Sequence, residues 1–244
     1  MHKQNKKNIA IICARGHSKG IPKKNIKLFH KKPLIVWAVE ACLNSNNISK
    51  VLVSTDSREI QEIAIKSGAD SPFIRPKKIA EDTTPLEPVL IHALNWLEKN
   101  ESYKPDSVSL IPATNPLRKP CHIDECINKF YTTNADNVMT VHESPANYTP
   151  YWSVTHSSKN GAFFYEDIDL RNGFTQRQAF PNKIYARNDI AYTFKPENLF
   201  KSKPSIYGEF NEILEMDRIY DGDINSHEDW EITEYIFSKL NIAK

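Results

Sequence analysis

The chain of 244 residues is 40% hydrophobic and 25% charged, and its formal net charge is +2. This composition is typical of a soluble globular protein and leaves enough chain for one sizeable hydrophobic core. No apolar run approaches the roughly 18 residues that cross a membrane, and residues 1–7 are too polar for a signal peptide, so we expect no membrane partner. The four cysteines lack paired metal-binding spacing, which favours free thiols and a cytoplasmic location.

Positive charge is concentrated at the start of the chain. Ten of the 32 basic residues precede the first acidic residue, Glu40, so the remainder holds 22 basic and 30 acidic residues. A uniformly basic surface would indicate nucleic acid, whereas a basic start on an acidic body indicates a focused anion site. We therefore expect no nucleic-acid partner. Residues 3–7 alone are equally well explained as a basic arm outside the fold.

Taken in chain order, the sequence predicts alternating strands and helices up to residue 141. Short β-branched runs predict the strands, and amphipathic runs with capping residues predict the helices, such as Ser57 before the second helix and Gly68 after it. The predicted strands are 9–14, 50–54, 71–74, 107–111 and 137–141, and the predicted helices are 33–45, 58–66, 85–100 and 121–132. Such alternation predicts an α/β fold with a mostly parallel, three-layer sheet and right-handed crossovers.

The alternation breaks after residue 141. Residues 144–178 contain many aromatic side chains without helical spacing, which predicts an irregular or β arm. The aromatic residues are explained either by a subunit interface or by a satellite core beneath a loop. A strand over 184–194 and a helix over 227–239 are predicted to complete the chain.

The segment from Ile9 to Ile26 has the strongest functional pattern in the chain. Its apolar first six residues are typical of a strand buried on both faces. The next twelve residues hold two glycines, four cations and no acid: Arg15, Gly16, Lys19, Gly20, Lys23 and Lys24. Glycine lets a backbone approach a ligand closely, and open α/β sheets place ligands after such strands, so this loop suits a polyphosphate. Pro22 favours an extended wrap over a helix that starts directly at the loop.

Two common phosphate loops do not fit, and a solvated basic loop remains an alternative. The order Ser18-Lys19-Gly20 does not match G-x-x-x-x-G-K-[ST], and the two glycines cannot make G-x-G-x-x-G.

The loop ARGHSKGIPKKN resembles the signature loop of the CMP-sialic acid synthetases, the cytidylyltransferases that activate acidic nine-carbon sugars. Weaker motifs follow in the family's order over nearly the whole chain: STD at 54–56, RP at 75–76, DTT at 82–84, TNPLR at 114–118 and DINSHEDW at 223–230. The resemblance implies a single domain over 1–244 with a Rossmann-like nucleotidyltransferase sheet. It also implies a homodimer, with a dimerisation and sugar-binding arm at 142–187.

The implied reaction is attack by a sugar hydroxyl on the α-phosphorus of CTP, with release of pyrophosphate. It needs cations around the phosphates and a site for Mg²⁺. By resemblance, Arg15 and Lys24 hold the triphosphate as catalytic residues, Asn25 fixes the nucleotide and Lys19 lies close by.

The resemblance assigns base recognition to the backbone near Ala14 and to Arg75, and it suggests that Asp82, Thr83 and Thr84 line the base or the ribose. Without it, Arg75 before Pro76 is better explained as a surface charge. The DTT motif is likewise explained as a helix-capping segment.

The metal site is expected late in the chain. By resemblance, the family's pair of aspartates falls on Asp223 and Asn225, so an uncharged amide replaces one carboxylate. Asp223 is then the main ligand for Mg²⁺, which prefers oxygen ligands. Asp221 is an alternative source of the missing charge, and a polar turn capped by Asn225 or Ser226 explains the segment without any metal.

The family's sugar site is only partly matched. Arg177, Asn188 and Tyr192 occupy family positions near the sugar, and Arg177 is suited to pair with its carboxylate. Pro112, Leu86 and Trp152 replace residues that are polar or basic in sialic acid enzymes. The resemblance therefore implies an acidic 2-keto-3-deoxy sugar, but it leaves open an eight-carbon sugar and GTP as the donor.

Two other functions were weighed. Asp221-Gly222-Asp223 is a D-x-D sequence, as in type A glycosyltransferases, but it lies far from mid-chain, where that motif is expected. An RNA-binding module would use the basic start, yet 9–26 has no aromatic residue on which bases stack.

Overall fold

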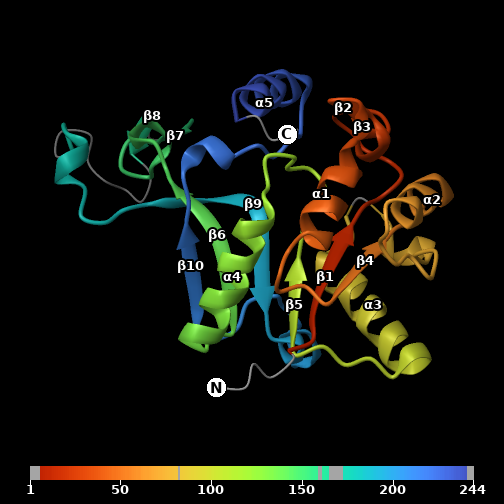
Figure 1. The fold of residues 1–244 in the computed structure, drawn as a ribbon. Coiled ribbons are helices and arrows are strands. Elements are labelled where there is room, and N and C mark those ends of the chain that lie inside the picture. Colours follow the sequence, from red (N-terminus) through yellow and green to blue (C-terminus); the bar gives the residue numbers. More distant parts are fainter. Residues whose placement is uncertain (1–5, 82, 159–160, 165–172, 241–244) are drawn as a thin grey trace.

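The computed structural model describes residues 6–81, 83–158, 161–164 and 173–240. A six-stranded sheet in the order β10-β6-β9-β5-β1-β4 forms its centre (Figure 1). Its strands are β1 Asn8–Cys13, β4 Lys50–Ser54, β5 Ser107–Leu110, β6 Asn137–Glu143, β9 Tyr185–Phe194 and β10 Asn211–Glu215.

Most neighbouring strands run parallel, as predicted. Strand β1 pairs in parallel with β4 and β5, and β10 pairs in parallel with β6, while β9 is antiparallel to both β5 and β6. The side chains of β1 alternate between two cores, with Ala10 and Ile12 on one face and Ile9 and Ile11 on the other. Burial on both faces explains the continuous apolar run in the sequence.

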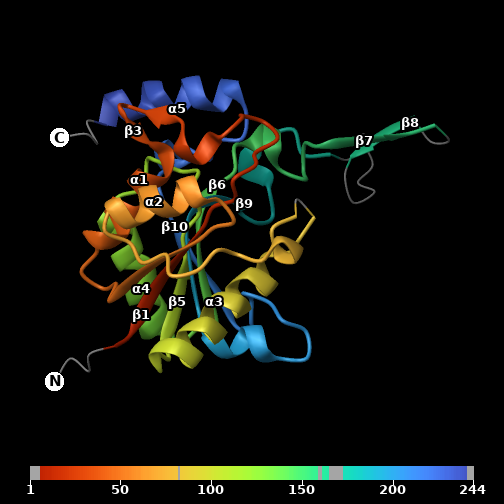
Figure 2. The same cartoon turned by 90° about the vertical axis from the view of Figure 1, so that its right-hand side faces the viewer.

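Helices cover both faces of the sheet and complete the three layers (Figures 1 and 2). On one face lie α1 Leu34–Leu43, α2 Arg58–Lys66 and α4 Pro120–Thr133. On the other lie α3 Leu86–Glu101 and a short 3-10 helix, Pro196–Phe200. The Ser57 side chain accepts a hydrogen bond from the Ile60 N–H, which confirms it as the cap of α2.

The last helix, α5 His227–Leu240, packs against residues 21–37 through a third core. It lies beside the small hairpin β2 Leu28–Phe29 and β3 Lys32–Pro33 (Figure 1). The Phe29 ring is 5.4 Å from Trp230 and 5.3 Å from Phe237, in edge-on geometry. Ile21 and Ile224 are buried in the same core, so it holds the basic loop against the segment before α5.

The predicted strand over 71–74 is wrong. Only a single bridge, between Leu52 and Asp70, reaches the free edge of β4. Beyond it, the Gln61 side chain donates to the carbonyls of Ser71 and Phe73, and it takes the place of a strand ladder.

Strand β10 was not predicted from the sequence. Its residues, Asn-Glu-Ile-Leu-Glu, lie at the edge of the sheet and are only partly covered, so they show no continuous apolar run. Its partner β6 supplies the pairing, in the register of Ile213 opposite Met139.

An irregularity in β9 is held by a buried arginine. The register between β6 and β9 shifts near Asp189, which has a left-handed φ of +51°. Arg118 is only 3% exposed and donates to the carbonyls of Pro112, Asp189 and Ile190 at 2.6–2.9 Å. It therefore fixes the loop after β5 to the irregular part of β9.

The arm contains a hairpin and a small aromatic core. Strands β7 Val154–Ser157 and β8 Gly161–Phe164 pair antiparallel and extend away from the body (Figure 2). The rings of Tyr151, Trp152, Phe174 and Phe180 contact one another at centroid distances of 4.8–5.8 Å. These partly buried rings form a small cluster within the arm, while Tyr165 lies outside the described residues.

Two further findings concern membrane-spanning helices and the state of the cysteines. In the described ranges, no helix combines the length and apolarity that a membrane crossing requires. Cys13, Cys42, Cys121 and Cys126 are free thiols.

Candidate active site

A cavity of about 410 Å³ opens at the carboxyl end of β1, where the sequence predicts a ligand. Its lining combines the basic loop, the start of α3 and single residues from other loops. The residues are Cys13, Arg15, Ser18, Lys19, Gly20, Lys24, Asn25, Arg75, Ile79, Ala80, Glu81, Thr84, Pro85, Leu86, Val89, Thr114 and Asn225. Arg15, Lys19, Lys24, Asn25 and Arg75 thus meet in one cavity.

Hydrogen bonds to residues 54–56 and one bond within the loop hold the basic loop in its extended course. The Gly16 N–H donates to Asp56 Oδ1 at 2.8 Å, and the Ala14 N–H donates to the Ser54 carbonyl at 3.1 Å. Asn25 is buried, and its Nδ2 donates to the Arg15 carbonyl at 2.9 Å. Ala14 and Asn25 are therefore bonded to the loop framework, and Ala14 is 1% exposed.

The basic loop touches the segment before α5 directly. A Cβ at residue 20 would lie 2.1 Å from the Asn225 carbonyl oxygen, so only glycine fits there. Lys24 Nζ donates to the Ile224 carbonyl at 2.5 Å and lies 3.5 Å from Asn225 Oδ1. Residues about 200 positions apart in the sequence thus form one wall of the cavity.

The Lys24 ammonium is in a partly desolvated position. Burial lowers the pKa of Lys24 from its usual value, the neighbouring Asp223 opposes this shift, and the Arg15 charge adds to it. A desolvated ammonium between an acidic and a cationic group is well placed to meet a phosphate oxygen.

Asp223 is held between two polar side chains that face the cavity. Its Oδ1 accepts a hydrogen bond from the Thr114 hydroxyl, and its Oδ2 accepts one from Asn225 Nδ2 at 2.6 Å. The carboxylate itself lines a neighbouring cavity of about 510 Å³, which also holds Asp221 and Asp229. Asp223 and Asn225 are therefore brought together, as predicted.

Asp221 has a different environment from Asp223. Its carboxylate lies 3.7 Å from Nε2 of the buried His142, although both aspartates line the same cavity of about 510 Å³. Burial raises the pKa of Asp221, and the nearby His142 opposes this shift.

The start of α5 is capped as the polar-turn alternative predicts. The backbone N–H groups of Asn225 and Ser226 donate to Asp229 Oδ2, and the Ser226 hydroxyl accepts from the Asp229 N–H. Capping uses the backbone of Asn225, and its side chain contacts Asp223 and Lys24 instead.

The side chains of Asp223 and Asn225 offer the kind of ligand atoms that Mg²⁺ prefers. Within the described residues, no group of three or more His, Cys, Asp or Glu side chains could hold a metal ion. Asp223 and Asn225 supply hard oxygen atoms, and Mg²⁺ commonly takes one or two carboxylates together with phosphate and water.

Arg75 is a buried framework residue that borders the cavity. It is 6% exposed, and its guanidinium donates to the Ser54 hydroxyl at 3.2 Å and to the Ser54 carbonyl. Thr83 is exposed and does not line this cavity, whereas Thr84 does. Asp82 lies outside the described residues.

The three expected sugar residues do not share a cavity. Arg177 is exposed at the base of the arm and lines a cavity of about 660 Å³ with Lys183 and Arg218. Asn188 is fully buried, and its carbonyl accepts from Asn115 Nδ2. Tyr192 is 4% exposed, and its hydroxyl donates to Asp189. Of these three residues, only Arg177 is therefore open to a ligand.

The structure adds residues that the sequence did not single out for these roles. Asp56 anchors the basic loop, Thr114 holds Asp223, and Arg118 fixes the loop that carries Thr114. The sequence could have indicated Asp56 and Thr114 by their position, because both follow the ends of predicted strands.

Comparison with known proteins identifies the family. A family model described as cytidylyltransferase matches residues 9–236. The chain belongs to the cytidylyltransferase family. The family predicted from the loop ARGHSKGIPKKN is thereby confirmed.

Similar proteins span the whole chain. The chain is 32% identical over 238 residues to a CMP-N,N'-diacetyllegionaminic acid synthase from Campylobacter jejuni, covering 96% of this chain and 97% of that protein. It is 41% identical over 125 residues to a pseudaminic acid cytidylyltransferase of the same species, covering 51% of this chain and 53% of that protein. The structure of CMP:2-keto-3-deoxy-manno-octonic acid synthetase complexed with CTP matches with a TM-score of 0.67 at 13% identity, covering 96% of this chain and 99% of that chain. At this identity, the structural match shows a shared fold.

Proposed function

We propose that this cytidylyltransferase couples CTP to an acidic 2-keto-3-deoxy sugar, giving a CMP-sugar and pyrophosphate. One observation carries the proposal. The basic loop meets the segment before α5, residues 221–226, here called the acidic segment, in a single cavity through Gly20, Lys24, Ile224 and Asn225. Cations beside an oxygen-rich site are what displacement at the α-phosphorus requires.

Each residue of the cavity has a defined task in this proposal. Arg15 binds phosphate oxygens with its planar guanidinium, and Lys24 places a compact charge beside the leaving pyrophosphate. Lys19 lines the same cavity and adds to its positive potential. Asn25 keeps the loop in shape through the Arg15 carbonyl.

We propose Asp223 and Asn225 as the residues that hold Mg²⁺. When bound, the ion would neutralise charge on the phosphate oxygens during the displacement. Thr114 orients Asp223 through its hydroxyl, and the cap at Ser226 fixes the backbone of Asn225.

The proposed sugar is a nonulosonic acid. The relatives act, by their names, on legionaminic and pseudaminic acids, and the cavity beside Arg177 has cationic partners for a carboxylate. Asn188 and Tyr192 are buried in β9, so they would act on the sugar site only indirectly, by keeping this strand in its conformation. GTP and eight-carbon sugars are the alternatives that a substrate panel distinguishes.

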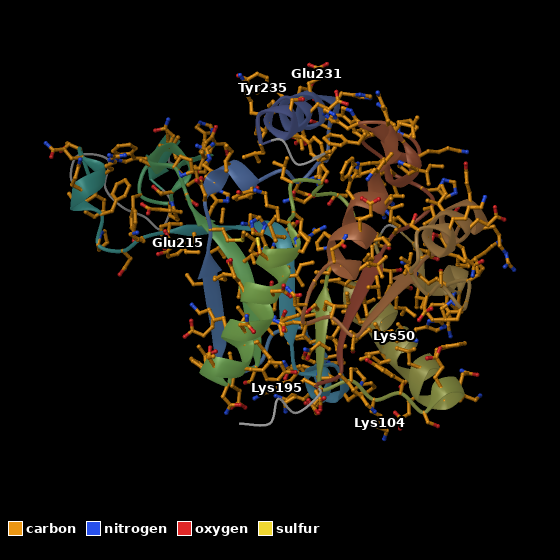
Figure 3. The ribbon with its side chains drawn as sticks, viewed as in Figure 1. Lys50, Lys104, Lys195, Glu215, Glu231 and Tyr235 are labelled. Carbon is orange, nitrogen blue, oxygen red and sulfur yellow. The ribbon has the colours of Figure 1, made fainter. Side chains whose placement is uncertain are left out.

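The two alternative functions have less support. Asp221 lies 3.7 Å from His142, whereas Asp223 is hydrogen-bonded to Thr114 and Asn225, so the two carboxylates of the D-x-D sequence have different partners. Lys50, Lys104 and Lys195 lie away from α5 (Figure 3), and each is paired with an acid, namely Asp70, Glu98 and Asp136 at 2.6–2.8 Å. Paired lysines of this kind do not favour RNA binding.

We propose a cytoplasmic location, because the reaction consumes CTP and the four thiols are unpaired.

A homodimer is also proposed. Tyr148 and Val154 of the arm are 74% and 62% exposed, and Ile232 and Tyr235 of α5 are 59% and 65% exposed. Tyr235 points away from the body of the protein (Figure 3). Apolar side chains exposed in this number are typical of surfaces that a partner covers. We expect sedimentation at micromolar concentration to give the mass of a dimer, and a fully active monomer would contradict the proposal.

The reaction itself is tested by pyrophosphate release. We expect release with CTP and a nine-carbon keto acid, in a panel of nucleoside triphosphates and eight- and nine-carbon sugars. Arg15→Ala and Lys24→Ala should each lower kcat/KM by roughly 10²–10³, because they remove charge that stabilises the transition state. Lys104→Ala, which removes an exposed lysine, is the control and should be unchanged. Near wild-type rates in both loop variants would disprove the assigned site.

The metal assignment is tested by three variants. Asp223→Asn should lower kcat by about 100-fold or more, because the main charged ligand is lost. Asn225→Asp should keep activity and lower the Mg²⁺ concentration for half-maximal rate, because it adds a charge. Asp221→Asn should leave that concentration nearly unchanged, since Asp221 pairs with His142. If Asp223→Asn retains the wild-type magnesium dependence, the metal is bound elsewhere.

A further inference from the structure

The buried side chain of Arg118 carries a charge that its contacts do not require. It is 3% exposed, and its hydrogen bonds go to three backbone carbonyls, those of Pro112, Asp189 and Ile190. Within the described residues it makes no ion pair, and its remaining nitrogen, Nη1, has no hydrogen-bond partner. Burying a guanidinium without an opposite charge is costly, so the charge calls for an explanation of its own.

A neutral side chain makes the same kind of connection three residues earlier. Asn115 Nδ2 donates to the Asn188 carbonyl at 2.9 Å and to the Tyr220 carbonyl at 3.0 Å, and Asn115 Oδ1 accepts from the Leu117 N–H at 3.0 Å. An amide therefore ties the loop after β5 to β9 without any charge. Hydrogen bonding to carbonyls alone does not account for an arginine at position 118.

The guanidinium keeps its charge in the interior. Burial lowers the pKa of Arg118 to about 10, and nearby acidic groups, Asp189 and Asp223 among them, oppose this shift. The side chain is therefore still a cation at neutral pH. Because the interior holds little water to screen the charge, its field reaches further than that of an exposed lysine.

The field of Arg118 falls on the acidic segment. The loop that Arg118 holds contacts this segment twice, because the Thr114 hydroxyl donates to Asp223 and the Thr114 carbonyl accepts from the Ile224 N–H at 3.0 Å. Asp223 shares its cavity with two further carboxylates. Three carboxylates would repel a triphosphate in the adjoining cavity, and a cation buried beside this loop opposes that repulsion.

We propose that the buried charge of Arg118 offsets the carboxylate of Asp223 and thereby strengthens the binding of the triphosphate in the adjoining cavity. This inference rests on the proposed function and adds to it a positioning residue that acts from within the core. A positive charge favours a bound anion and disfavours a bound cation. The charge should therefore act in opposite directions on CTP and on a divalent metal ion.

The test measures the binding of two oppositely charged probes without turnover. CTP binding is measured by calorimetry in the absence of metal, and Mn²⁺ binding is measured by electron paramagnetic resonance in the absence of nucleotide. Arg118→Gln, which removes the charge, should weaken CTP binding by about fivefold or more and strengthen Mn²⁺ binding by a similar factor. Arg118→Lys keeps the charge but not the planar set of donors, so it should shift both affinities much less. The control is Asn115→Ala, which removes hydrogen bonds of the same loop without a change of charge and should not shift the two affinities in opposite directions.

Opposite shifts of the two affinities distinguish the charge from a structural role, because a displaced loop would weaken the binding of both probes. Weaker binding of both probes in Arg118→Gln, unchanged binding of both, or equal losses in the glutamine and lysine variants would overturn the role of the charge. Melting temperatures identify a variant that does not fold, and Arg118→Met then replaces the glutamine variant with the same expected shifts. If the wild-type protein binds CTP but releases pyrophosphate with no keto sugar, the proposed function fails, and the binding comparison still decides the role of Arg118.

Discussion

The contact between Gly20 and the backbone of Asn225 is the constraint on which the site depends. It brings a basic loop from the first strand against an acidic segment from the end of the chain, at a separation that leaves no room for a Cβ. Lys24 reinforces the contact through the Ile224 carbonyl, and Ile21 and Ile224 are buried together in the core under α5. The helix that completes the fold therefore also completes the cavity.

The rest of the sheet serves this contact by fixing the loops around it. Parallel pairing of β1 with β4 and β5 places three strand ends at one edge, from which Asp56 holds the basic loop and Thr114 holds Asp223. Arg118 joins the loop of Thr114 to β9 from within the core. The residues proposed to bind phosphate are therefore different from the residues that hold them in position.

How much the sequence can predict depends on whether a feature is local. The strand before the basic loop and the cap at Ser57 follow from adjacent residues, and the structure confirms both. Gly20 and Asn225 are about 200 residues apart in the sequence, so no spacing rule predicts their contact. Only the family resemblance assigns them to one site. Strand β10 was missed because its pairing with β6, and not its own polar sequence, makes it a strand. The segment 71–74 was misassigned because a side chain, Gln61, takes the hydrogen bonds of a ladder.

Hydrogen exchange with and without CTP and Mg²⁺ tests the central claim most directly, because it reports both halves of the site in one experiment. The account predicts that amide exchange slows in residues 15–25 and in residues 221–226 over the same range of CTP concentration, since the two segments form one cavity. Slowing confined to residues 15–25 at saturating CTP, with residues 221–226 unchanged, would contradict it.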